Sequence, residues 1–252
     1  MSRLVKLLAL CAFFAVFAVV WLCIPAPGVP ILAYHMVNDQ EEAYSIAPAQ
    51  FAAQIAYLAE RGYTAISLQE YFMARDGLGQ LPDKPVIITF DDGYADNYLT
   101  ALPILERHGM KATVFVISEA VGQPGYLTWE QIREMQARNT EIGSHTASHV
   151  ALREVDDREK RRQLQESAKV LQQNLQTPVQ FLAYPFGSFE PGVFRVLQET
   201  GYRGACTGKP GINRLDQAVY ALKRINVPRP KYGLWEFKIR LLRANIYSRL
   251  GI

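Results

Sequence analysis

Short apolar runs rich in β-branched residues alternate with helical patterns along most of this chain, and that alternation restricts the fold more than any other feature. The clearest run, Val86–Phe90 (VIITF), lies between Pro85 and a polar turn, as a strand buried on both faces would. Between such runs, apolar residues recur at the spacing of an amphipathic helix. Six or more strand–helix units in about 225 residues predict a parallel α/β sheet closed into a barrel, with its helices outside.

Residues with known structural preferences mark the ends of the expected elements. Pro48 suits the first turn of a helix and Gly62 its end, while Thr128 and Gln131 form a capping box. The expected strands are Val29–Tyr34, Thr64–Ser67, Val86–Phe90, Ala112–Ile117, Glu141–Ser144, Phe181–Tyr184, Tyr202–Cys206 and Val219–Val227. The expected helices begin near Pro48, Asn97, Thr128, Asp156 and Pro191 and end near Gly62, His108, Asn139, Gln176 and Thr200.

The N-terminus carries an uninterrupted apolar run, Leu7–Ile24, which is about 18 residues long and would span about 27 Å as a helix. Arg3 and Lys6 precede this run, which predicts that the start stays in the cytoplasm and the rest is exported. One N-terminal transmembrane helix and a cleaved signal peptide are the two interpretations. Trp21–Pro25 offers no small-x-small cleavage site, which favours a membrane anchor with the folded domain extracytoplasmic; cleavage would give a secreted protein.

Composition divides the chain into three regions. Residues 1–28 form the predicted signal-anchor and a proline-rich linker, residues 29–227 the barrel, and residues 228–252 a basic amphipathic helix. The last region has one acid, Glu236, against the cations Arg229, Lys231, Lys238, Arg240, Arg243 and Arg249. This helix could lie on anionic lipid beside the anchor, or pack across the barrel with its basic side in solvent.

Charge and cysteine content exclude other classes of protein. A net charge of +3, without a basic run interleaved with aromatic residues, argues against nucleic acid as a partner. Cys11 and Cys23 lie in the apolar run, so Cys206 has no partner within the barrel. We therefore expect no disulfide within the domain.

Two aspartates and two histidines follow predicted strands. Asp91 and Asp92 come directly after the VIITF strand, and Gly93 allows the backbone to turn sharply there. His145 and His149 have i,i+4 spacing, so both imidazoles can reach one ion if their segment forms a turn. One carboxylate and two imidazoles leave positions open for water and a substrate carbonyl. We therefore expect one divalent metal ion; zinc suits these ligands, and cobalt, nickel or iron would also fit.

Three motifs together resemble those of the polysaccharide deacetylase family, also called the NodB homology domain or carbohydrate esterase family four. They are TFDDGY (Thr89–Tyr94), HTASH (His145–His149) and YPFG (Tyr184–Gly187), in the order of the family. The resemblance covers residues 30–227. It implies a distorted (β/α) barrel of the NodB-homology type, with fewer than eight full units.

The resemblance also implies the roles of the motif residues. Asp92, His145 and His149 would hold the metal, and Asp91 would be the general base. A carboxylate beside a ligand lies within Coulomb reach of the ion, yet stays free to accept a proton. The implied partner is an N-acetylated glycan.

The chain departs from common members of the family in its general acid. Those members use a histidine in a late Leu-x-His motif, but no histidine follows His149 here. His108 ends a helix, where it would complement the helix dipole. His35 follows Tyr34 in a pair that resembles the early motif of the branch acting on poly-N-acetylglucosamine. We assign the general acid to His35 by elimination and by this resemblance.

A second departure is Ala183, which stands where many members have an arginine that orients the base. Arg224 is the candidate replacement, and a surface arginine is the alternative. Tyr184, Pro185 and Phe186 are expected to shape the sugar groove, with the backbone near Tyr184 as an oxyanion donor, or else to belong to the core.

The sequence thus predicts a metal-dependent hydrolase that removes N-acetyl groups from N-acetylglucosamine units of an extracytoplasmic polysaccharide. A peptidoglycan or chitooligosaccharide deacetylase would use identical chemistry. A catalytically inactive, membrane-tethered glycan-binding protein is the alternative from another class, and Ala183 and the missing late motif favour it.

Overall fold

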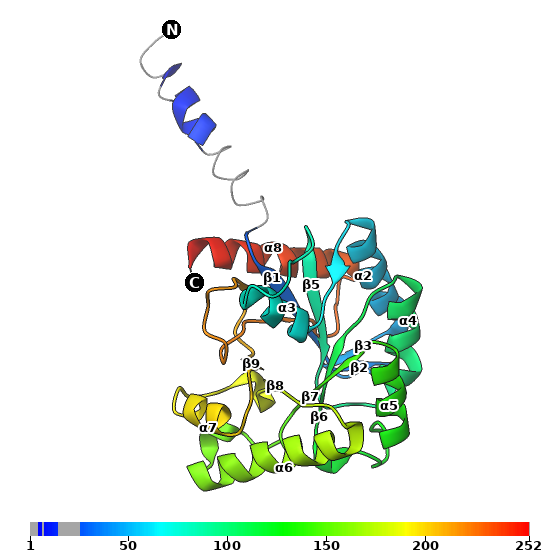
Figure 1. The fold of residues 1–252 in the computed structure, drawn as a ribbon. Coiled ribbons are helices and arrows are strands. Elements are labelled where there is room, and N and C mark those ends of the chain that lie inside the picture. Colours follow the sequence, from blue (N-terminus) through cyan, green and yellow to red (C-terminus); the bar gives the residue numbers. More distant parts are fainter. Residues whose placement is uncertain (1–4, 7, 15–25, 252) are drawn as a thin grey trace.

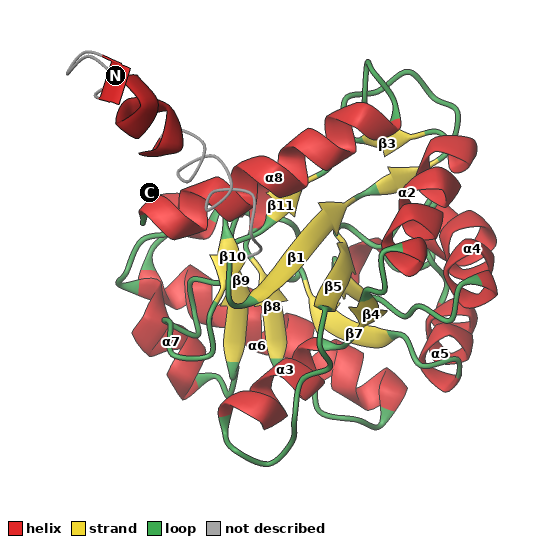
Figure 2. Cartoon of the chain, turned by 90° about the horizontal axis from the view of Figure 1, so that it is seen from above, coloured by secondary structure: helices red, strands yellow, loops and turns green. Residues whose placement is uncertain are grey.

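The computed structural model describes residues 5–6, 8–14 and 26–251, in which helices surround a central sheet (Figures 1 and 2). The strands are β1 (Val29–Tyr34), β2 (Met36–Val37), β3 (Ser45–Ile46), β4 (Thr64–Ala65), β5 (Pro85–Phe90), β6 (Thr113–Val116), β7 (Glu141–Ser144), β8 (Phe181–Ala183), β9 (Gly204–Cys206), β10 (Ile212–Asn213) and β11 (Ile225–Asn226). The α-helices are α2 (Pro48–Glu60), α3 (Leu68–Arg75), α4 (Leu102–Arg107), α5 (Trp129–Ala137), α6 (Asp157–Leu175), α7 (Val193–Glu199) and α8 (Leu234–Leu250). The short helical turns are η1 (Asn97–Ala101), η2 (Ser118–Ala120), η3 (Leu152–Glu154) and η4 (Pro185–Gly187).

The main sheet forms the distorted α/β barrel that the strand–helix alternation predicts. Its strand order is β10-β1-β5-β6-β7-β8-β9, with β4 beside β5 and β11 beside β1. All of these pairs are parallel except β1 with β10. On the closing side, a single bridge joins Cys206 of β9 to Leu222, and the chain then enters β11 beside β1. The barrel is distorted on this side, because one bridge between Cys206 and Leu222 stands where a regular barrel would have a full pair of strands.

Alternate side chains of the central strands enter different cores. Ile31 and Ile87 belong to a buried cluster that also contains residues of β6, β8 and β9. Ile88 belongs to another cluster, formed with α2, α4, α5 and α8. Because the side-chain direction alternates along a strand, His35 and Asp91 continue the row of Ile31 and Ile87 beyond the strand ends. The strand register therefore directs both polar groups toward the inside of the barrel.

Helix α3 was not predicted, and the expected strand Thr64–Ser67 was wrong in its second half. Ser67 is the N-cap of α3: its side chain accepts a hydrogen bond from the Glu70 amide, and Glu70 returns one to the Ser67 amide. This capping box starts a helix directly after β4. Tyr71 and Phe72 of α3 are buried in the cluster of Ile31 and Ile87, so α3 contributes to the inner core.

Two other expected elements differ in length or type. The helix expected from Asn97 to His108 consists of the π-helical turn η1 followed by α4. Pro103, near the start of α4, cannot donate a backbone hydrogen bond, which accounts for the break in the α-helical pattern. The strand expected at Val219–Val227 is confined to β11, with the Leu222 bridge before it.

The basic C-terminal region forms α8, which lies across one end of the barrel in Figure 1 and contacts α2, β10 and β11. Phe237, Ala244 and Asn245 are buried on its inner side. Trp235 and Ile239 are exposed, so α8 carries apolar residues on two sides and is not the simple amphipathic helix that was expected.

The predicted transmembrane helix, Leu7–Ile24, falls largely outside the described residues. Among the helices that the structure does describe, none combines the length and the apolar character needed to cross a bilayer.

Gly143 provides a test of the inner packing. An added Cβ would lie 2.5 Å from the buried Phe115 ring and 3.1 Å from the Phe181 carbonyl oxygen. We expect Gly143→Ala to lower the free energy of unfolding by about 1–3 kcal/mol, because the overpacked ring must move. The matched control is Gly192→Ala, where the nearest atom lies at an ordinary 3.6 Å. Equal urea midpoints for the two variants would contradict this account.

Candidate metal centre and active site

A cavity of about 210 Å³ opens where the carboxyl ends of the central strands meet. His35 follows β1, Asp91 and Asp92 follow β5, and His145 follows β7. Parallel strands bring residues that are distant in the chain to one edge, which is where barrel active sites are built. The cavity is lined by His35, Tyr44, Asp91, Asp92, His145, His149, Phe186, Gly187, Gly208, Arg224 and Asn226.

The three predicted metal ligands face one another. The potential ligand atoms of Asp92, His145 and His149 all lie within 4.8 Å of one another. Asp92 Oδ1 lies 3.4 Å from His145 Nε2 and 3.3 Å from His149 Nε2. This oxygen is buried and accepts no hydrogen bond from the described part of the chain. One carboxylate oxygen and two imidazole nitrogens around a common point fit a zinc-type ion.

The backbone at this site adopts conformations that non-glycine residues rarely use. Asp92 has φ 71°, Thr146 has φ 66° and His149 has φ 60°, all in the left-handed region. Such conformations cost of order 1–3 kcal/mol each and persist only where the surroundings impose them. The Thr146 hydroxyl accepts a hydrogen bond of 3.0 Å from the His149 amide, which closes the turn of the HTASH motif. This turn brings the two imidazoles together.

A backbone carbonyl orients His145. Its ring is buried, and Nδ1 lies 2.8 Å from the carbonyl oxygen of Ala183. In the tautomer in which Nδ1–H donates to this oxygen, Nε2 presents a lone pair toward Asp92 and His149. Such hydrogen bonds hold metal-binding histidines in position. Ala183 therefore supports the site through its backbone.

Arg224 holds the carboxylate of Asp91 in a two-pronged ion pair. Its Nη1 and Nη2 donate to Oδ1 and Oδ2, each over 2.7 Å, and both side chains are almost completely buried. Its Nε donates to the Thr207 carbonyl over 2.9 Å, and Nη1 also reaches the Thr89 hydroxyl at 3.3 Å. The structure thus brings the candidate Arg224 onto Asp91 and excludes the surface alternative.

The charges of the site fix the ionisation of both carboxylates. Burial alone would raise the pKa of Asp91, but the neighbouring Arg224 charge outweighs it and holds the pKa well below its usual range. Burial is likewise outweighed at Asp92, whose pKa is lowered by the contact with His145. Burial also lowers the pKa of His149, whereas at His145 the carboxylates overcome burial and raise the pKa. Two ionised carboxylates beside two imidazoles favour a dication.

His35 reaches the cavity beside Asp91. Its Nε2 lies 3.9 Å from Asp91 Oδ2, and its ring packs on Tyr44 with centroids 4.6 Å apart. Asn97 donates a hydrogen bond of 2.8 Å to the His35 carbonyl, which fixes the backbone. Burial lowers the pKa of His35, and the charge of Asp91 opposes that effect. His108 is exposed at the end of α4 and does not line the cavity.

The YPFG motif contributes less to the cavity than expected. Tyr184 and Pro185 are buried and do not line it. The Tyr184 amide donates to Cys206 O over 3.0 Å, and its hydroxyl donates to Tyr220 O over 3.0 Å. Of the two interpretations, Tyr184 and Pro185 follow the one that assigns them to the core, and the amide of Tyr184 itself is already used in a hydrogen bond. Phe186 is 71% exposed and packs on His149, with ring centroids 4.7 Å apart.

Two aromatic residues of the site were not predicted. Tyr94 stacks on Tyr126, and burial together with the charge of Asp92 raises the pKa of Tyr94. Its place in the TFDDGY motif was the sequence signal that could have identified Tyr94 as a residue of the site. Tyr44 is 57% exposed and lies in an irregular segment without a sequence signal. The pairing of β2 with β3 brings it beside His35.

Comparisons with known proteins agree with this fold. The family model for polysaccharide deacetylases matches residues 79–205. YxkH of Bacillus subtilis, named as a polysaccharide deacetylase, is 32% identical over 208 residues, which cover 82% of this chain and 74% of YxkH. The poly-beta-1,6-N-acetyl-D-glucosamine N-deacetylase of Escherichia coli K12 is 30% identical over 141 residues, 48% of this chain and 21% of that protein. The Streptococcus pyogenes deacetylase PplD, solved with acetate, aligns with a TM-score of 0.79 at 25% identity, covering 88% of this chain and 99% of PplD.

The chain belongs to the polysaccharide deacetylase family and is a hydrolase of that family. Its barrel is the NodB-type fold of the family, as the motifs implied.

The ion pair of Arg224 with Asp91 predicts a change in pH dependence. Arg224→Gln removes the charge that lowers the pKa of Asp91. Burial then raises that pKa, so Asp91 loses its proton only at a higher pH. The acid limb of the pH profile of deacetylation is expected to move upward by about one unit or more. Arg224→Lys, which keeps the charge, should shift it less, and Arg195→Gln on the surface should not shift it. An unchanged acid limb in Arg224→Gln would show that the charge of Arg224 does not control the ionisation of the base.

Proposed function

We propose that this protein is a metal-dependent hydrolase that removes N-acetyl groups from N-acetylglucosamine units of an extracytoplasmic polysaccharide. One observation carries the proposal. A carboxylate and two imidazoles face a common point in the cavity, beside a second carboxylate that Arg224 keeps ionised. This set provides three ligands and a separate base, which is what amide hydrolysis by an activated water requires.

A glucosamine polymer is the substrate class that the relatives support. The E. coli relative is named for poly-β-1,6-N-acetyl-D-glucosamine, and its match includes 48% of this chain. Tyr44 and Phe186 expose aromatic rings at the cavity, packed on His35 and His149. Aromatic faces are apolar surfaces on which the hydrophobic face of a sugar ring can rest.

The ion would be held by Asp92, His145 and His149. When bound, such an ion lowers the pKa of water and polarises the acetyl carbonyl. The left-handed turns at Asp92 and His149 and the carbonyl behind His145 hold the three ligand groups in place. The donor set of one oxygen and two nitrogens suits zinc, and also cobalt, nickel or iron.

Asp91 and His35 would carry the protons. Asp91, ionised at neutral pH, accepts a proton from the attacking water while the water oxygen bonds to the acetyl carbon. His35, in its protonated form, gives a proton to the sugar nitrogen as the carbon–nitrogen bond breaks, so a neutral amine leaves. His35 Nε2 and Asp91 Oδ2 lie 3.9 Å apart, so the proton returns from Asp91 to His35 through one bridging water. Acetate and the free amine are the products.

The position of Arg224 argues against the alternative of an inactive glycan-binding protein. The absence of an arginine at Ala183 favoured that alternative, because the base then had no orienting partner. Arg224 supplies the missing partner from the segment directly before β11. Peptidoglycan or chitooligosaccharides as substrates remain the competing proposal within the same chemistry.

We further propose that the catalytic domain lies outside the cytoplasm and is anchored to the membrane. The apolar run Leu7–Ile24, with Arg3 and Lys6 before it, supports this location.

The activity can be tested with the full chain purified in detergent. We expect it to hold one divalent ion and to release acetate from acetylated glucosamine oligomers, with higher turnover on β-1,6-linked chains than on chitin or peptidoglycan fragments. A chelator should abolish turnover, and zinc should restore it, because without the ion nothing lowers the pKa of the attacking water or polarises the acetyl carbonyl. Metal content by mass spectrometry and acetate release would be measured together. Bound metal without acetate from any of these glycans would establish the binding protein instead.

The acid assignment predicts opposite behaviour for two histidines. His35→Ala should reduce turnover by about 100-fold or more while keeping the metal, because the amine then leaves without a proton donor. His108→Ala is the matched control and should retain both turnover and metal, since this residue is exposed and outside the cavity. Full turnover by the His35 variant would remove it as the general acid.

A further inference from the structure

Helix α8 has a second apolar face, which points away from the barrel. Phe237, Leu241 and Ala244 pack into the core. About half a turn around the helix, apolar residues recur at intervals of three or four positions. We call these residues the outer stripe: Trp235, Ile239, Leu242, Ile246 and Leu250. Trp235 is 66% exposed and Leu250 55% exposed. Ile239 and Leu242 are also exposed, and Ile246 is partly buried. Single exposed apolar residues are ordinary, but a row of them along one helix face marks an interaction surface.

Cations flank the outer stripe. Lys238 lies on one side of it, and Arg243 and Arg240 lie on the other. Arg240 pairs with Glu236 over 2.6 Å. Lys238 and Arg243 lie against the rings of neighbouring tyrosines, and neither forms an ion pair with any described residue. An apolar stripe with an indole and flanking cations is typical of a helix at the interface of an anionic bilayer.

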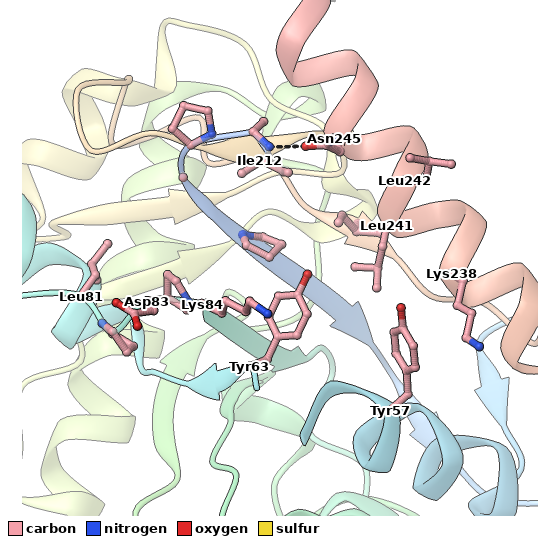
Figure 3. A pocket seen from close by; sticks show the side chains of 17 residues that line it. Tyr57, Tyr63, Leu81, Asp83, Lys84, Ile212, Lys238, Leu241, Leu242 and Asn245 are labelled. Carbon is pink, nitrogen blue, oxygen red and sulfur yellow. Dashed lines mark hydrogen bonds between the residues drawn. The ribbon is translucent and has the colours of Figure 1, made fainter. Parts of the chain in front are cut away.

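A groove of about 560 Å³ adjoins the outer stripe (Figure 3). Leu242 and Lys238 line it from α8, and Tyr57, Tyr63 and Lys84 line it from the other side. Leu242 belongs to both surfaces, so the groove is continuous with the stripe. Its apolar wall and its two lysines, against the single acid Asp83, suit an amphiphile with an anionic head.

The chain enters the barrel at the same place. The amide of Ala26 donates a hydrogen bond to the Asn245 side chain of α8, and Ala26 lines the groove. Only Pro25 separates Ala26 from the apolar run Leu7–Ile24. A chain that leaves a bilayer after Ile24 would therefore reach the domain on α8.

We propose that the outer stripe and the adjoining groove dock the domain on an anionic bilayer. Pro30, at the start of β1, lines the groove, whereas His35, just beyond its end, lines the catalytic cavity. The six-residue strand β1, about 20 Å long, lies between the two sites. Docking through the outer stripe would therefore leave the catalytic cavity about one strand length from the groove. This inference rests on the proposed location of the domain and is independent of the catalytic roles.

The test uses the full chain in lipid vesicles. Of its three tryptophans, only Trp235 lies on the outer stripe. A Trp21→Phe/Trp129→Phe variant leaves Trp235 as the sole indole. The matched control, Trp21→Phe/Trp235→Phe, leaves Trp129 on α5, which Figure 1 shows apart from α8. Vesicles of phosphatidylcholine, with or without phosphatidylglycerol, carry lipids brominated on the acyl chain, which quench only an indole that enters the bilayer.

We expect brominated anionic vesicles to quench Trp235 about twofold or more relative to Trp129, and neutral vesicles to quench it less. Lys238→Gln/Arg243→Gln, added to the Trp235 variant, should reduce the quenching in anionic vesicles to the neutral level. Quenching of Trp235 no greater than that of Trp129 overturns the proposal and leaves a second copy of the chain as the occupant of the stripe. Equal quenching in neutral and anionic vesicles overturns the role of the cations. Acetate release in the same samples reports separately on the proposed function.

Discussion

The buried ion pair between Arg224 and Asp91 connects the segment before β11 to the end of β5 within the catalytic site. The two residues are 133 positions apart in the chain, and their side chains are almost completely buried. A buried charge is tolerated only when it is paired and its donors are used. Arg224 also donates to Thr207 and Thr89, so its charge is well satisfied. The pair lies on the side where a single bridge closes the barrel, and it fixes the ionisation of Asp91.

The same pair separates the roles of two adjacent and chemically identical carboxylates. Asp91 accepts hydrogen bonds from Arg224 on both oxygens, which sets its direction. Asp92 turns away through its left-handed backbone and presents a buried, unsatisfied oxygen to His145 and His149. One carboxylate is therefore restrained as a proton acceptor, and the other is available as a ligand. The left-handed turn directly after β5 makes this division possible, because it sends the two adjacent side chains in different directions.

Much of the fold followed from local sequence signals, and the errors have physical causes. The apolar strands β1, β5 and β6 were predicted close to their observed positions because a doubly buried strand leaves a continuous apolar run. Helix α3 was missed although its capping box, Ser67 and Glu70, is visible in the sequence. For Tyr184 the sequence left a groove role and a core role open, and the structure uses its amide and hydroxyl within the core.

The sequence by itself determined the alternation of strands and helices, the ligand motifs and the family, because each depends on residues close together in the chain. Only the tertiary structure decided that Arg224 holds Asp91, that Tyr44 packs on His35, and that α8 exposes a second apolar face. The first two contacts join segments that the sheet brings together, and the third depends on which side of α8 the barrel covers. No local pattern encodes such relations, because they arise from the register of the strands and the packing of the helices around them.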